Sequence, residues 1–109
     1  MTLSTHVLDT ALGVPAKAVA IRLLLGSEVL FVGMTDEDGR CPGIKTLDLA
    51  KGTYRLEFNV ADYFKSTGLS LAEPPFLDRV SLEFGIDGIR HYHIPLLVSP
   101  YGYSTYRGS

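Results

Sequence analysis

Apolar and polar residues alternate through much of the chain, and this alternation predicts short β-strands. The clearest run is TYRLEFNV at residues 53–60, where Tyr54, Leu56 and Phe58 alternate with charged or polar residues. A period of two turns such side chains to one face of a strand, where they can be buried. Similar patterns, or short β-favouring runs, predict further strands in residues 3–9, 18–25, 29–35, 79–86, 89–99 and 101–107.

Short polar segments mark the turns between these strands. Residues 26–28, GSE, join two apolar runs, so residues 18–35 are expected to form a β-hairpin. The segment TDEDGR, which ends at Arg40, supplies the acidic side chains and the glycine that a tight turn requires. The pair Asp87–Gly88 is a strong hairpin signal and predicts that its two flanking strands are partners. A Gly-Val-Pro loop at residues 13–15 is expected to follow the first strand.

One segment has a helical rather than a strand period. In ADYFKSTGL, residues 61–69, Ala61, Phe64 and Lys65 can share a helical face, and Gly68 suits the end of a helix. Seven or eight strands with one short helix predict an all-β sandwich. The chain of 109 residues is long enough for a single domain, residues 1–109, with its own core.

Composition and charge narrow the class of protein. The net charge is −2 and no long basic stretch occurs, so nucleic acid is not an expected partner. The apolar runs are too short to span a membrane, and the first ten residues lack the pattern of a secretory signal. The one cysteine, Cys41, cannot form an internal disulfide, which indicates a reducing compartment and a cytoplasmic location. Its neighbour Arg40 could lower the pKa of Cys41, but without a thiol-enzyme motif a bystander role is favoured.

The three histidines are the first candidates for chemistry. His91 and His93 lie two residues apart, so a strand would turn both to one face, opposite Tyr92 and its neighbours. His6 lies in the first predicted strand. From spacing alone, exposed or hydrogen-bonded structural histidines are favoured over a site. A zinc site made by His6, His91 and His93 is the alternative, although no carboxylate or cysteine motif supports it.

The tail YGYSTYRGS is rich in tyrosine and favours a β-strand. No proline or lysine between Tyr101 and Tyr106 protects this strand against pairing, so we expect its edge to be paired, at a sheet edge or a subunit interface. Arg40, Arg55 and Arg107 each have a guanidinium that could hold an oxygen-rich ligand, but a solvated turn or surface role is the default for each.

Four segments together resemble the 5-hydroxyisourate hydrolases, the transthyretin-related enzymes of urate breakdown. They are LSTHVLDTALGVPA, TDEDGR, HYHIPLLVSPYGYSTY and the terminal YRGS, in the order and near the spacing of that family. The resemblance implies a transthyretin-like β-sandwich of two four-stranded sheets with one short helix. It also implies a homotetramer, a dimer of dimers, with active sites at the dimer–dimer interface and no cofactor.

The resemblance also implies which residues act on the substrate. The matching motif positions are His6, Arg40, His93 and Ser109 as catalytic residues, with His91 and Tyr106 as substrate-binding residues. The implied reaction is hydrolysis of 5-hydroxyisourate to 2-oxo-4-hydroxy-4-carboxy-5-ureidoimidazoline, by histidine-assisted attack of water on a cyclic amide. The terminal carboxylate and hydroxyl of Ser109 are expected to belong to the pocket. The alternative is a non-catalytic, transthyretin-like carrier of a small ligand.

Overall fold

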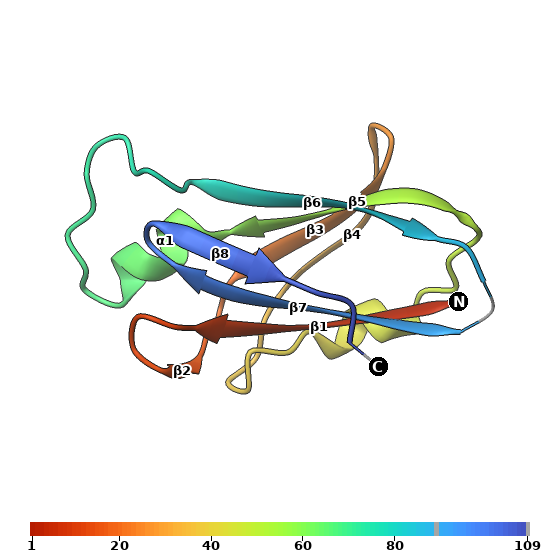
Figure 1. The fold of residues 1–109 in the computed structure, drawn as a ribbon, viewed down its shortest axis with the longest axis horizontal. Helices are drawn as coiled ribbons and strands as arrows, with labels where there is room; N and C mark the ends of the chain where they lie inside the picture. Colours follow the sequence, from red (N-terminus) through yellow and green to blue (C-terminus); the bar gives the residue numbers. More distant parts are fainter. Residues whose placement is uncertain (89, 109) are drawn as a thin grey trace.

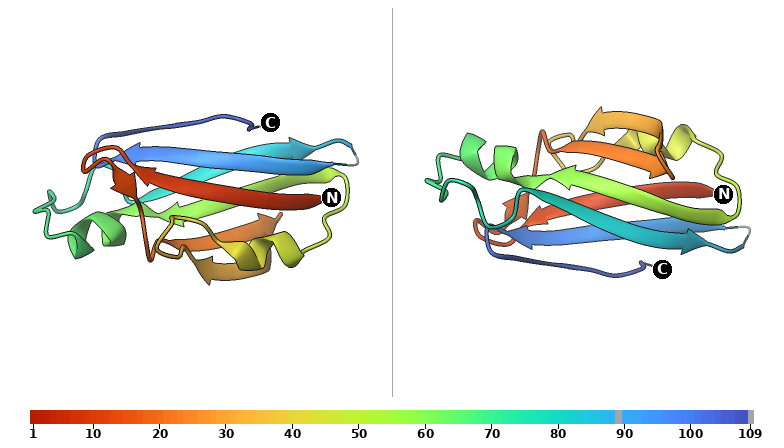
Figure 2. Two further views of the ribbon diagram at one scale, coloured as in Figure 1. Left: turned by 90° about the horizontal axis from the view of Figure 1, so that it is seen from below. Right: turned by 90° about the horizontal axis from the view of Figure 1, so that it is seen from above.

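The chain folds into two four-stranded β-sheets that pack face to face. The computed structural model describes residues 1–88 and 90–108 (Figures 1 and 2). The first sheet has the strand order β2-β1-β7-β8, with bounds Val14–Pro15, Thr2–Asp9, His91–Ser99 and Gly102–Thr105. The second sheet has the order β4-β3-β5-β6, with bounds Glu28–Met34, Ala20–Leu25, Gly52–Asn59 and Arg79–Ile86. The predicted two-sheet sandwich is confirmed.

Two short helices connect the strands in the described ranges. The helix α1, Val60–Ser66, follows β5 at one end of the sandwich, and a 3-10 helix, η1, spans Pro42–Thr46 (Figure 1). The predicted helix is confirmed, and Gly68 follows it with a positive φ of 92°. The 3-10 helix was not predicted. Within the described ranges, no helix combines the length and the apolar composition needed to cross a bilayer.

The core lies between the inner faces of the two sheets. Alternation in β5 buries Tyr54, Leu56 and Phe58, as predicted, and α1 adds Phe64 to the same cluster. Burying one such large side chain stabilises the fold by about 1.5–3 kcal/mol. In β1, the inward residues alternate with Thr2, Ser4 and His6, which lie on the outer face of the first sheet and are partly buried. The same period therefore builds the core and supplies polar groups outside it.

The hairpin predicted at Asp87–Gly88 is wrong. The strand β6 pairs with β5 in the second sheet, whereas β7 pairs with β1 and β8 in the first, so the chain crosses between sheets here. The Tyr92 hydroxyl donates to Asp87 Oδ1 at 2.6 Å and accepts from the backbone N–H groups of Asp87 and Gly88. This tyrosine holds the Asp-Gly pair in a corner between sheets. The loop expected at Val14–Pro15 is also wrong, because both residues pair with the end of β1.

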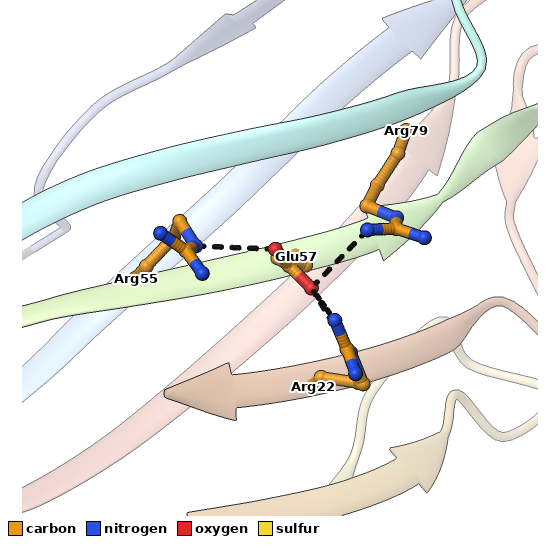
Figure 3. Close-up of polar contacts among 4 residues, drawn as sticks. All are labelled: Arg22, Arg55, Glu57 and Arg79. Atoms are coloured by element: carbon orange, nitrogen blue, oxygen red, sulfur yellow. Dashed lines mark hydrogen bonds and ion pairs between the residues drawn. The ribbon is translucent and has the colours of Figure 1, made fainter. Parts of the chain in front are cut away.

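A buried carboxylate organises the outer face of the second sheet. Glu57 is 6% exposed, although its position in β5 points away from the core (Figure 3). Arg22 donates to Glu57 Oε1 at 2.6 Å and Arg55 donates to Oε2 at 3.1 Å. Arg79 Nη1 lies 3.8 Å from Oε1. Three strands are thus linked through one side chain, and Arg55 is ion-paired rather than simply solvated.

Replacing Glu57 by glutamine is expected to lower the free energy of unfolding by about 1–2 kcal/mol at pH 7, less than for a fully buried ion pair because the arginines are partly exposed. Burial alone would raise the pKa of Glu57, but Arg22, Arg79 and Arg55 outweigh it and hold the pKa below 4.5. A lowered folded pKa means that this stabilisation is present above pH 4.5 and is lost as the pH falls through the folded value.

Urea unfolding of the unchanged chain and of Glu57→Gln between pH 7 and pH 3 measures this contribution. The difference between the two should shrink at low pH. The exposed Glu83→Gln, on the neighbouring strand β6, is the control and should change stability by less than about 0.5 kcal/mol. A Glu57→Gln difference that stays constant over this pH range would contradict the ion-pair account.

Candidate functional site

Arg40 reaches the outer face of the first sheet because a tight turn returns the chain to β1. The Asp36 carboxylate accepts from the backbone N–H groups of Asp38 at 2.9 Å and Arg40 at 3.0 Å. Gly39 has a φ of 75°, and a Cβ on it would collide with the Val7 carbonyl oxygen. The predicted turn is confirmed, and it places Arg40 opposite His6 in an isolated antiparallel bridge.

The same turn fixes the tautomer of His6. His6 Nε2 lies 2.8 Å from the carbonyl oxygen of Asp38. A carbonyl only accepts hydrogen bonds, so this nitrogen carries a proton and donates it. A neutral His6 therefore keeps its lone pair on Nδ1, where it can accept a proton.

The pair His91 and His93 lies on the same outer face, as the HxH spacing predicts, because β7 runs parallel to β1. The register sets His91 opposite Thr2 and His93 opposite Ser4. Ser4 Oγ lies 2.7 Å from His91 Nε2 and 2.7 Å from His93 Nδ1, and Thr2 Oγ1 lies 2.6 Å from His91 Nδ1. Four side chains therefore form one continuous hydrogen-bonded row.

His93 is held in its neutral form. Burial first, then the nearby basic groups of Arg40, His6, His91 and Lys45, lower the pKa of His93 below 6.5. These groups lie on β1, β7, η1 and the turn that ends at Arg40, so four separate segments surround His93. At neutral pH an imidazole in this environment is a proton acceptor.

The end of the chain approaches His93. After β8, Gly108 forms an isolated antiparallel bridge with His93 and donates its backbone N–H to the His93 carbonyl at 2.7 Å. The next residue, Ser109, lies outside the described residues. Tyr106 lies between β8 and this bridge, is exposed, and borders a separate hollow of about 330 Å³ between β6 and the tail. The structure thus brings together His6, Arg40, His91 and His93, whereas Tyr106 borders another hollow.

If the hydrolysis implied by the resemblance takes place at this site, replacing Gly108 by alanine is expected to lower its rate about tenfold. The new Cβ would lie 2.7 Å from His93 Cδ2 and must displace the imidazole. Gly102→Ala is the matched control: it also lies in the tail region, and a Cβ there meets nothing within 4 Å. Steady-state rates and thermal unfolding of both variants test this. Equal rates for the two variants would mean that the imidazole position does not matter.

A hollow of about 190 Å³ beside these residues is lined by Ser4, Thr5, Arg40, Cys41, Pro42 and Lys45. Cys41 is buried, and burial followed by the charge of Asp36 raises the pKa of its thiol. The suggestion that Arg40 lowers the pKa of Cys41 is therefore wrong, and the bystander role agrees with the raised pKa.

Among the described residues, no three histidine, cysteine or acidic side chains are grouped so that they could hold a metal ion, which leaves the zinc alternative without support.

Sequence reasoning missed Ser4 and Lys45. Alternation along residues 3–9 does place Ser4 on the face of His6, but only the parallel pairing of β1 with β7 places it between two histidines. Lys45 belongs to the unpredicted helix η1. Neither residue lies in a pattern whose spacing points to a site.

The chain is similar to known proteins over almost its whole length. Residues 3–108 match the HIUase/Transthyretin family. A 5-hydroxyisourate hydrolase of Caulobacter vibrioides is 49% identical over 98% of this chain and 97% of that protein. The solved structure of Klebsiella pneumoniae 5-hydroxyisourate hydrolase has a TM-score of 0.86 and 36% identity, covering 99% of this chain and 93% of that one.

A longer protein contains the same fold. The crystal structure of (S)-allantoin synthase gives a TM-score of 0.92 and 42% identity over 99% of this chain. This chain spans only 43% of the length of that protein. The fold is therefore shared between chains of different length.

Proposed function

The chain belongs to the HIUase/Transthyretin family, and we propose on that premise that it hydrolyses 5-hydroxyisourate to 2-oxo-4-hydroxy-4-carboxy-5-ureidoimidazoline in urate breakdown. The observation that carries the proposal is the convergence of His6, Arg40 and His93 on one sheet face, from three segments far apart in the sequence. The curated relatives of nearly equal length that carry this hydrolase name support it.

Each group suits one need of the reaction. Water must lose a proton as it attacks the ring carbonyl, and His93, neutral at pH 7, is the proposed acceptor. Arg40 is proposed to hold the carbonyl oxygen and stabilise the developing negative charge. His6, with its Nδ1 lone pair, is proposed to orient the water or the substrate. His91 is proposed to bind the substrate and Ser109 to act as a catalytic residue, a role that the approach of Gly108 to His93 supports. Tyr106 borders the other hollow, so the geometry of one chain does not support its expected contact with the substrate.

The assay uses 5-hydroxyisourate made freshly from urate by urate oxidase. The unchanged chain is expected to speed its decay and to give one optically active product. Tight binding without faster decay would instead favour the carrier alternative, whose pocket is expected to be mostly apolar. The imidazoles and guanidinium on this face argue against such a carrier.

The proposed assembly is a homotetramer, a dimer of dimers, in the cytoplasm. The edge of β8 and the exposed rings of Tyr101, Tyr103 and Tyr106 support subunit contacts through this region. Sedimentation at micromolar concentration tests the assembly, and a monomer there would contradict it. A free, buried Cys41 agrees with a reducing compartment, and fractionation of cells tests the location.

A further inference from the structure

Ser4 is the one hydroxyl in the described site that contacts both histidines of β7. Its Oγ lies 2.7 Å from His91 Nε2 and 2.7 Å from His93 Nδ1. A serine hydroxyl has one proton and two lone pairs. It can therefore donate to only one of these imidazoles at a time, and it must accept from the other if both hydrogen bonds are kept.

This proton count leaves two arrangements for neutral histidines. In the first, Ser4 donates to His93 Nδ1, so His93 carries its proton on Nε2, and His91 Nε2 donates to Ser4. In the second, Ser4 donates to His91 Nε2, His93 Nδ1 donates to Ser4, and His93 Nε2 keeps a lone pair. Thr2, at 2.6 Å from His91 Nδ1, can donate or accept and fits both arrangements. His6, whose partner is a carbonyl oxygen, has no such freedom.

We propose that Ser4 is a positioning residue that couples the tautomers of His91 and His93, so that the row Thr2–His91–Ser4–His93 carries protons to and from the reactive imidazole. The coupling itself is inferred from the geometry of these four side chains. Its role in catalysis rests on the proposed hydrolysis. Its action on the substrate passes through His93, since Ser4 itself need not touch the substrate.

The row lets His93 change from base to acid without becoming charged. In the second arrangement, His93 Nε2 takes a proton from water as the hydroxide adds to the substrate carbonyl. The Nδ1 proton of His93 moves to Ser4, the Ser4 proton moves to His91 Nε2, and the His91 Nδ1 proton moves to Thr2, whose own proton passes to solvent. One proton enters and one leaves. His93 now carries its proton on Nε2, which is what the leaving ring nitrogen requires.

A double-mutant cycle read by imidazole ¹⁵N resonances tests the coupling without substrate. Replacing His91 by alanine frees the Ser4 proton for His93 Nδ1, so the Nε2–H form of His93 is expected to gain about threefold over the Nδ1–H form. In the Ser4→Ala background the same change at His91 is expected to leave the His93 tautomer ratio nearly unaltered. An equal shift in both backgrounds would overturn the proposal, because charge alone would then carry the effect.

Steady-state kinetics test whether the coupling between the two histidines contributes to the proposed hydrolysis. The Ser4→Ala variant is expected to lose about tenfold in kcat with KM within about twofold, and Ser4→Thr, which keeps the hydroxyl, is expected to restore the rate. Ser81→Ala, an exposed strand serine on β6, is the matched control. A wild-type kcat in Ser4→Ala would overturn the proposal. If the unchanged chain does not act on 5-hydroxyisourate at all, the proposed function fails, and the resonance cycle still decides the coupling.

Discussion

The His93→Ala variant is expected to hydrolyse 5-hydroxyisourate with a kcat/KM about 10²- to 10⁴-fold below that of the unchanged chain, the range that general acid–base catalysis contributes. The reason is that burial and nearby basic groups lower the pKa of this imidazole, which suits it to the proposed role of proton acceptor. The measurement is the initial rate on substrate made freshly by urate oxidase. Thermal unfolding within a few degrees of the unchanged chain would show that the fold is intact.

The pH dependence provides a second measurement of the same role. A base must be neutral to act, and the pKa of His93 lies below 6.5. We therefore expect kcat/KM to fall in acid as His93 is protonated, and to do so at a lower pH than for an imidazole with the ordinary pKa. A loss of less than about threefold in His93→Ala would assign the proton acceptor to another residue.

The Asp9→Ala variant is expected to lose about 3–5 kcal/mol of unfolding free energy, the largest effect on stability that we expect here. Asp9 is 1% exposed at the end of β1. Its carboxylate accepts from the backbone N–H groups of Ala11 at 2.8 Å and Leu12 at 3.0 Å, and from the Tyr63 hydroxyl at 2.7 Å. Alanine would leave these three donors without an acceptor and would open a cavity.

Two variants separate these contributions in urea unfolding. Tyr63→Phe removes only the hydroxyl donor and is expected to cost about 1–2 kcal/mol. Burial first, then the hydrogen bond and charge of Asp9, raise the pKa of Tyr63, so this phenol stays protonated as a donor. Asp62→Ala, an exposed carboxylate in α1, is the control and should cost about 0.5 kcal/mol. A loss in Asp9→Ala no larger than in Asp62→Ala would contradict the account.

Local patterns predicted the strands well because burial follows alternation. The run at residues 53–60 and the Gly39 turn needed no information from elsewhere in the chain. Pairing between distant strands was not predictable in this way. Asp87–Gly88 has the composition of a hairpin turn. The two flanking strands lie in different sheets that cover the same core, however, and the Tyr92 hydroxyl holds the Asp-Gly pair where the chain passes from one sheet to the other.

In the candidate site too, local features were predictable and contacts between distant segments were not. The HxH spacing predicts the shared face of His91 and His93, and motif resemblance rather than spacing linked them with His6 and Arg40. The contacts of the Ser4 hydroxyl with the two histidines and the burial of Glu57 both depend on which strands are neighbours. The sequence of a single segment does not contain this information. Outward strand positions are ordinarily solvated, so a buried outward carboxylate follows only from its three arginines.

The parallel pairing of β1 with β7 ties the reactive groups to the interior. Leu3 and Val7 face the core, while Thr2, Ser4 and His6 alternate with them on the opposite face. A slip of one residue in this pairing would turn hydroxyls and imidazoles inward and aliphatic side chains outward. Loss or gain of a single residue inside either strand is therefore expected to disturb folding and reactivity alike, whereas length changes in exposed loops away from the site are expected to leave both largely unchanged. Evolution of this protein is consequently expected to vary the loops away from the site in length, and to keep these two strands and the turn at residues 36–40 at constant length.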